Sequence, residues 1–151
     1  MDDLNRHMER ALAAGEKAWR EHGDVPVGAL LLDPAGSVIS TAVNKRELER
    51  DPTAHAEIVA IREGGLALNN WRLDGCTLIV TLEPCAMCAG AIMQSRISRL
   101  VFGAWDEKAG AVGSVVDLIR DPRALSKVEV IPGVLADRSS ALLKEFFAQA
   151  R

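Results

Sequence analysis

Two short motifs in this chain carry the side chains that a catalytic metal site needs. They are His-Ala-Glu, which begins at His55, and Pro-Cys-Ala-Met-Cys, which ends at Cys88. The spacing of Cys85 and Cys88 lets two thiolates share one metal ion, and His55 can supply a third ligand. Three protein ligands leave the fourth tetrahedral position of zinc open to water, whose pKa zinc lowers from about 16 toward roughly 7. Glu57 lies close enough to the histidine in sequence to move protons to and from that water.

The elements around both motifs are predicted to place them at helix starts. One helix should begin with either Asp51 or Thr53 as its N-cap and end near residues 64–65, and another should begin at Pro84. The two cysteines, three positions apart, share a helix face, and the partial positive charge of a helix N-terminus favours their thiolates. The histidine and glutamate are about 200° apart on a regular helix, so they can meet only in front of a helix end. The two helix starts are therefore expected to face one another.

The rest of the chain alternates amphipathic helices with short apolar strands. The strand, helix and strand around the cysteine motif predict a parallel pair joined by a crossover, with the site beyond the carboxyl ends of the strands. We therefore expect one zinc-dependent α/β domain over residues 1–151. The expected elements are a helix over 4–22, a hairpin of strands over 26–32 and 37–43, strands over 76–82, 99–103 and 127–131, and a last helix around 142–147.

Composition and charge narrow the class of protein. The chain is 48% hydrophobic and 26% charged, and no apolar run approaches the ~20 residues that span a bilayer. Its first residues lack the basic and apolar regions of a signal peptide, so we expect a cytoplasmic protein with no membrane partner. Three cysteines, two of them in Cys-x-x-Cys, suit a reducing compartment. The net charge of −3 gives no overall basic excess of the kind that nucleic-acid-binding proteins usually show.

The same motifs allow two other interpretations, a redox pair and a closed structural zinc site. A structural site needs a fourth protein ligand, and only Cys76, His7 and His22 remain for that role. Cys76 is expected to fill a core position of a strand, and both histidines fall on the first helix. The two motifs together, each at a predicted helix start, favour the catalytic interpretation.

The combination of His-x-Glu with Pro-Cys-x-x-Cys is the signature of zinc-dependent deaminases, and this chain resembles the bacterial tRNA adenosine deaminases. The similarity extends from about Trp19 to Phe147. The zinc motif alone fits every cytidine-deaminase-like enzyme, whereas the blocks between Phe102 and Ser114 are typical of the tRNA branch. Other matching blocks are Asp-Val-Pro-Val-Gly-Ala at 24–29, Asp-Pro-Thr-Ala-His-Ala-Glu-Ile at 51–58, Thr-Leu-Glu-Pro-Cys-Ala-Met-Cys-Ala-Gly-Ala at 81–91 and Ser-Arg-Ile at 95–97.

This resemblance implies a three-layer α/β/α fold of the cytidine deaminase type around a mixed five-stranded sheet. It implies one Zn²⁺ per subunit, held by His55, Cys85 and Cys88, and a homodimer that builds its RNA surface across two subunits. The implied reaction is hydrolytic deamination of the wobble adenosine of arginine tRNA, anticodon ACG, to inosine. Hydroxide held on zinc would attack C6 of adenine, and Glu57 would move the protons. The alternative on the same fold is a deaminase of a free nucleobase or nucleoside.

The resemblance also assigns residues that would contact the substrate. Asn44 would hydrogen-bond the flipped base, Val27 would line the pocket, and Asp106 would sit beside the ribose-phosphate at the pocket mouth. A turn or capping role is the alternative for the asparagine and the aspartate. In a single-stranded anticodon loop, the free-energy cost of flipping the adenosine is low, at about a few kcal/mol or less. Further contacts are expected from Ala56 and Pro84.

Overall fold

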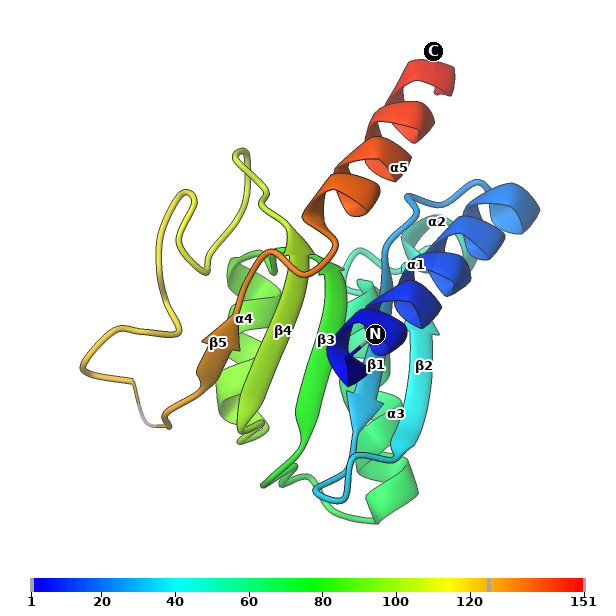
Figure 1. The fold of residues 1–151 in the computed structure, drawn as a ribbon. Helices are drawn as coiled ribbons and strands as arrows, with labels where there is room; N and C mark the ends of the chain where they lie inside the picture. The colour runs from blue at the N-terminus through cyan, green and yellow to red at the C-terminus, as the bar shows by residue number, and fades with distance from the viewer. Residues whose placement is uncertain (1, 125, 151) are drawn as a thin grey trace.

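A central mixed sheet lies between helices on both of its faces (Figure 1). The computed structural model describes residues 2–124 and 126–150, so the expected outer bounds of the domain, Met1 and Arg151, lie outside the described residues. Within those ranges, no helix is long and apolar enough to cross a membrane. The elements in chain order are α1 (Asp3–His22), β1 (Gly28–Leu32), β2 (Val38–Val43), α2 (Arg46–Glu49), α3 (Ala56–Leu68), β3 (Thr77–Leu82), α4 (Ala86–Gln94), β4 (Arg99–Ala104), β5 (Glu129–Ile131) and α5 (Ala136–Gln149).

The strand order brings the ends of four strands together at the edge where the site forms. Within the described residues the sheet has five strands in the order β2-β1-β3-β4-β5. β1 is antiparallel to β2 and β3, whereas β3, β4 and β5 run parallel. The predicted hairpin and the predicted parallel crossover are therefore confirmed. As a result, the carboxyl ends of β2, β3 and β4 meet the amino end of β1 at one edge.

The core is built as two layers of side chains, one on each face of the sheet. α1 and α5 cover one face, and α3 and α4 cover the other (Figure 1). β1 and β3 are buried on both faces, in agreement with their continuous apolar sequence. Leu30 and Ile79 pack with α1, whereas Leu31 and Leu78 belong to the core on the side of α3. The predicted three-layer architecture is confirmed.

The start of α3 differs from the prediction, which placed its N-cap at Asp51 or Thr53. His55 itself is the N-cap, with extended backbone at φ −66° and ψ 154°. The Asp51 carboxylate instead accepts hydrogen bonds from the backbone N–H of Thr53 at 2.8 Å and from its hydroxyl at 2.7 Å. These bonds close a turn ahead of the helix, a local use of the aspartate side chain that competes with helix capping.

The end of α3 also differs, because the helix continues past the predicted end at residues 64–65 to Leu68. Gly64 is buried against the sheet, and a Cβ added there would lie 2.1 Å from Cδ2 of Leu31. The glycine therefore allows close packing of the helix on the sheet and does not end the helix.

Gly28, at the start of β1, allows a similarly close contact with α1. A Cβ there would lie 2.0 Å from the carbonyl oxygen of Ala11. We expect Gly28→Ala to destabilise the fold by about 1–3 kcal/mol, because overpacking forces the helix backbone to move. Equilibrium urea denaturation measures this change.

Gly90→Ala in α4 is the matched control for that substitution. A Cβ at Gly90 would have nothing within 4 Å among the described residues. Alanine is the better helix former by roughly 0.5–1 kcal/mol, so this variant should equal or exceed the wild type in stability. Equal urea midpoints for the two variants would contradict the packing argument.

Candidate metal and catalytic site

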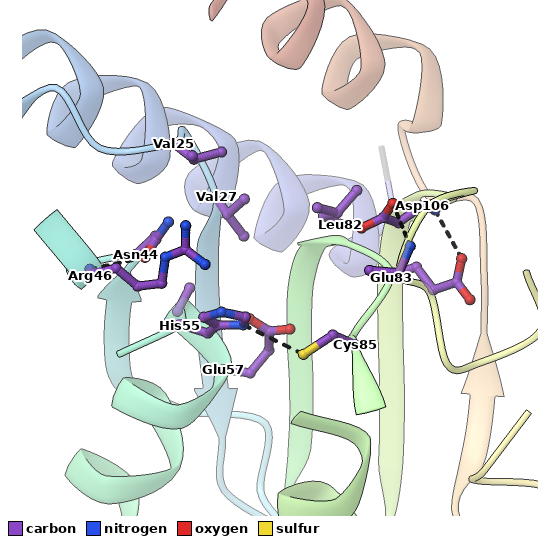
Figure 2. Close-up of a pocket in the computed structure, with 12 residues that line it drawn as sticks. Val25, Val27, Asn44, Arg46, His55, Glu57, Leu82, Glu83, Cys85 and Asp106 are labelled. Carbon is purple, nitrogen blue, oxygen red and sulfur yellow. Dashed lines mark hydrogen bonds between the residues drawn. The ribbon is translucent and has the colours of Figure 1, made fainter. Parts of the chain in front are cut away.

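The two predicted motifs meet as facing helix starts (Figure 2). His55 is the N-cap of α3 and Cys85 is the N-cap of α4, with Cys88 one turn further along. α4 thus begins after Cys85 and not at Pro84 as predicted. The reason is that the Pro84 carbonyl accepts a hydrogen bond from the N–H of Ala111 at 2.8 Å, which places this proline in the packing of a neighbouring loop.

The distances between the three side chains match those of a zinc site. Nδ1 of His55 lies 3.6 Å from Sγ of Cys85 and 3.5 Å from Sγ of Cys88. All three ligand atoms lie within 4.8 Å of one another. Zinc–sulfur bonds of about 2.3 Å and zinc–nitrogen bonds of about 2.0–2.1 Å at a tetrahedral angle separate N and S by about 3.6 Å. The residues therefore fit Zn²⁺, and the predicted ligand cluster is confirmed.

A fourth protein ligand is absent from this cluster. In the described part of the chain, the three residues are the one group of histidine, cysteine or acidic side chains arranged to hold a metal ion. Cys76 is buried as a free thiol just before β3, and His7 and His22 lie on α1 outside the group. Three protein ligands and an open fourth position distinguish a catalytic zinc site from a structural one.

Protons in the cluster are distributed unevenly between the two thiols. The hydrogen bond from Cys88, together with the one from His55, lowers the pKa of Cys85 to about 3 despite its burial. The hydrogen bond with Cys85 in turn raises the pKa of His55, and it also raises the pKa of Cys88, where burial adds to the effect. The cluster therefore favours a thiolate at Cys85 and a protonated thiol at Cys88. Metal binding must release protons, as ligand deprotonation requires.

Glu57 occupies the second position of α3 and is only 5% exposed. Its carboxyl group lies beside the side chains of His55 and Cys85 (Figure 2). Burial raises its pKa to about 7. A carboxyl group with such a pKa can both accept and donate a proton near neutral pH, which suits a general acid and base. The predicted meeting of the histidine and the glutamate in front of one helix start is confirmed.

A pocket of about 220 Å³ opens over these groups. It lies at the edge of the sheet where the strands end, as predicted for an α/β sheet. Four of the five expected substrate contacts line it, and within the described residues Pro84 does not. The four are Val27 before β1, Asn44 after β2, Ala56 in α3 and Asp106 after β4.

The alternative capping roles of Asn44 and Asp106 are also observed. Oδ1 of Asn44 accepts a hydrogen bond from the N–H of Arg46 at 3.1 Å. Oδ1 of Asp106 accepts from the N–H groups of Lys108 and Ala109 at 3.0 and 3.2 Å. Each side chain therefore fixes the turn that carries it and faces the pocket as well.

The short helix α2 was not predicted from the sequence, and it adds Arg46 to the pocket lining. The buried carboxylate of Asp24 accepts hydrogen bonds from the N–H groups of Glu47 and Leu48 at 2.9 and 3.2 Å. A carboxylate from a distant segment thus caps this helix, so the usual local signal was missing. Four further lining residues were not predicted from the sequence: Val25, Leu82, Glu83 and Ala109.

The sequence matches a family model that describes a zinc-binding region, in agreement with the geometry of the three ligands. The model of the cytidine and deoxycytidylate deaminase zinc-binding region matches residues 1–104, which include all three ligands. The chain belongs to this family of zinc-dependent deaminases.

Within that family, similar relatives are proteins named for transfer RNA. The tRNA-specific adenosine deaminase of Haemophilus influenzae is 49% identical over 144 residues, which are 95% of this chain and 83% of that protein. The protein of the same name from Bacillus subtilis is 44% identical over 145 residues, 96% and 89% of the two chains. A solved structure from a study of A-to-I editing by tRNA:A34 deaminases at the wobble position matches with a TM-score of 0.86 and 43% identity. That match covers 91% of this chain and 99% of the other.

Proposed function

We propose that this protein is a hydrolytic deaminase that converts the wobble adenosine of a transfer RNA to inosine and ammonia. The observation that carries the proposal is the buried carboxyl group of Glu57 beside an open three-ligand site at the base of a pocket. The relative named tRNA-specific adenosine deaminase, at 49% identity, supports adenosine in tRNA as the substrate. We assign the anticodon ACG of an arginine tRNA as the specific target, as the resemblance in sequence implies.

The chemistry divides between the metal and one carboxyl group. His55, Cys85 and Cys88 would hold zinc, which when bound lowers the pKa of water toward roughly 7 and supplies hydroxide at neutral pH. Glu57 takes a proton from the attacking water and gives it to N1 of adenine as the bond from oxygen to C6 forms. It then carries the second proton to the amino group, so that the C6–N bond breaks and ammonia leaves. A pKa near 7 lets Glu57 act in both directions.

The pocket lining supplies the contacts that orient the base. Because Oδ1 of Asn44 is bonded to Arg46, its amide nitrogen is the group that donates to the base. Val27 and Ala56 provide apolar walls, and Asp106 accepts a hydrogen bond from the ribose at the mouth. The expected contact from Pro84 stays a prediction.

We propose that a homodimer is the form that binds the anticodon loop. Leu66 and Trp71 are 83% and 62% exposed and line one surface hollow, which supports burial of this region against a second subunit. We also propose a cytoplasmic location, because two reduced thiols are needed to bind the metal and the three cysteines are free.

The proposal is tested with the zinc-loaded protein and an anticodon stem-loop that carries ACG. Free adenine, cytosine and guanine are incubated in parallel, and products are identified by mass spectrometry. We expect inosine at the wobble position and no turnover of the free bases, because only the stem-loop offers the ribose and backbone contacts. A stem-loop with GCG is the matched control, since it lacks only the target adenosine. Deamination of a free base with the ACG stem-loop unchanged would support the proposed reaction but contradict tRNA as its substrate.

A further inference from the structure

Glu83 is a buried carboxylate that the proposed mechanism does not use. It follows β3 directly, comes two residues before the zinc ligand Cys85, and is 2% exposed. It also lines the pocket, where Figure 2 shows its side chain directed toward the segment that carries Asp106. A buried carboxylate is costly unless it is well paired, so its partners indicate what it does.

All the partners of the Glu83 carboxylate belong to one loop, residues 105–114. Oε1 accepts a hydrogen bond from the N–H of Asp106 at 2.9 Å. Oε2 accepts from the N–H groups of Val112 and Ser114, each at 3.0 Å, and the Ser114 hydroxyl donates to Oε1. Three backbone donors and one hydroxyl of this loop therefore converge on a single side chain.

The loop is built closely around this carboxylate. A Cβ added at Gly110 would lie 2.3 Å from Cδ of Glu83, so the loop backbone packs directly against the side chain. The N–H of Gly110 donates to the carbonyl of Asp106 at 2.8 Å. Asp106 and Ala109 from this loop form part of the pocket wall. Holding the loop in place therefore fixes that wall.

The backbone of the same segment completes the link to the metal ligands. The N–H of Glu83 donates to the carbonyl of Ala104, and the carbonyl of Pro84 accepts from Ala111, both at 2.8 Å. One short segment, residues 83–85, thus carries the carboxylate that holds the pocket wall and the cysteine that begins the metal site. A shift of the loop relative to this segment would change the distance from the wall to the reacting base.

We propose that Glu83 is a positioning residue for deamination, which sets the wall at Asp106 and Ala109 relative to the zinc ligands. This inference rests on the proposed function and adds a residue to it. An amide in place of the carboxylate keeps the shape but cannot accept from all four donors, because its NH₂ group would face an N–H. In Glu83→Gln the loop should therefore become more mobile, while the metal ligands stay in place.

The test compares zinc-loaded Glu83→Gln with Glu107→Gln, which makes the same chemical change at an exposed site in the same loop. Zinc content, amide hydrogen exchange at Val112 and Ser114, and kcat and KM on the ACG stem-loop are measured. In Glu83→Gln we expect full zinc content and at least about tenfold faster exchange at both amides. We also expect KM to rise by about tenfold or more and kcat to change less than about threefold, since the wall binds substrate but does not react. Glu107→Gln should match the wild type.

Unchanged exchange, or faster exchange with an unchanged KM, would overturn the positioning role. Ser114→Ala serves as a milder variant that keeps the carboxylate and removes one donor, and it should raise KM by roughly two- to fivefold. If Glu83→Gln does not fold, a wild-type KM in Ser114→Ala overturns the proposal. A wild-type protein inactive on the stem-loop would instead overturn the proposed function, and the exchange rates would still report whether Glu83 holds the loop.

Discussion

Replacing Glu57 by glutamine is expected to lower kcat on the ACG stem-loop by at least about 10²–10⁴-fold, the usual contribution of general acid–base catalysis. The amide has nearly the same shape as the carboxyl group but can neither take a proton from water nor deliver one to the base. The carboxyl group lies next to the zinc ligands and is not one of the three, so zinc should remain bound. Single-turnover rates and zinc content, measured on the same preparation, check both parts of this expectation.

Glu63→Gln is the matched control for Glu57→Gln. It makes the same substitution on the same helix, at an exposed position outside the pocket lining. Wild-type kcat is expected there. Residual turnover in Glu57→Gln above about one hundredth of the wild type would remove Glu57 from the proton-transfer role, since that loss is smaller than acid–base catalysis supplies. Loss of zinc in Glu57→Gln would indicate a role in metal binding.

Cys88→Ala is expected to lose both zinc and activity. His55 and Cys85 remain after the substitution, and two protein ligands are too few to hold the ion in a tetrahedral site. Zinc content should fall from about one per chain to a small fraction, as expected for a site with one ligand missing. Turnover should fall by at least about 10³-fold, because the pKa of water then stays near 16. Metal analysis after dialysis and single-turnover rates measure the two effects.

Cys76→Ala provides the control for that variant. Cys76 is a fully buried free thiol in the core and lies outside the ligand cluster. Its loss should affect stability modestly and leave zinc content and turnover unchanged. Full zinc content in Cys88→Ala would show that the metal is held elsewhere and would contradict the assignment of the site.

The parts of the site that were predicted correctly depend on residue types and on spacings between residues close together in the sequence. Few residue types bind zinc, and three-residue spacing already brings Cys85 and Cys88 together on one helix turn. The hairpin and the parallel crossover were predictable for a similar reason, since the length of a connection distinguishes the two. The facing of the two helix starts then followed from the position of His55 and Glu57 at a helix end.

The parts that were missed depend on contacts between distant segments. Asp24 caps α2 across 23 positions, and Glu83 reaches amides 23 to 31 positions away. Neither contact leaves a spacing in the sequence that would reveal it. The N-cap predicted for α3 was wrong for a different reason. The side chain of Asp51 accepts a hydrogen bond from the N–H of Thr53 in a tight turn. The local sequence is as compatible with such a turn as with a helix start.

The charges around the pocket have a consequence for how a nucleic acid can enter it. Glu57, Asp106 and Arg46 all line the pocket, where Glu57 is buried and Arg46 is exposed. Arg46 and Asp106 lie on opposite sides of the site (Figure 2). Anionic phosphates are repelled by carboxylates and attracted by a guanidinium, whereas a nucleobase carries no net charge. A strand is therefore expected to offer its uncharged base to the interior while its phosphates stay outside, away from the carboxylates. We expect the pocket to select by polarity as well as by size, because it admits an uncharged base more readily than a phosphate.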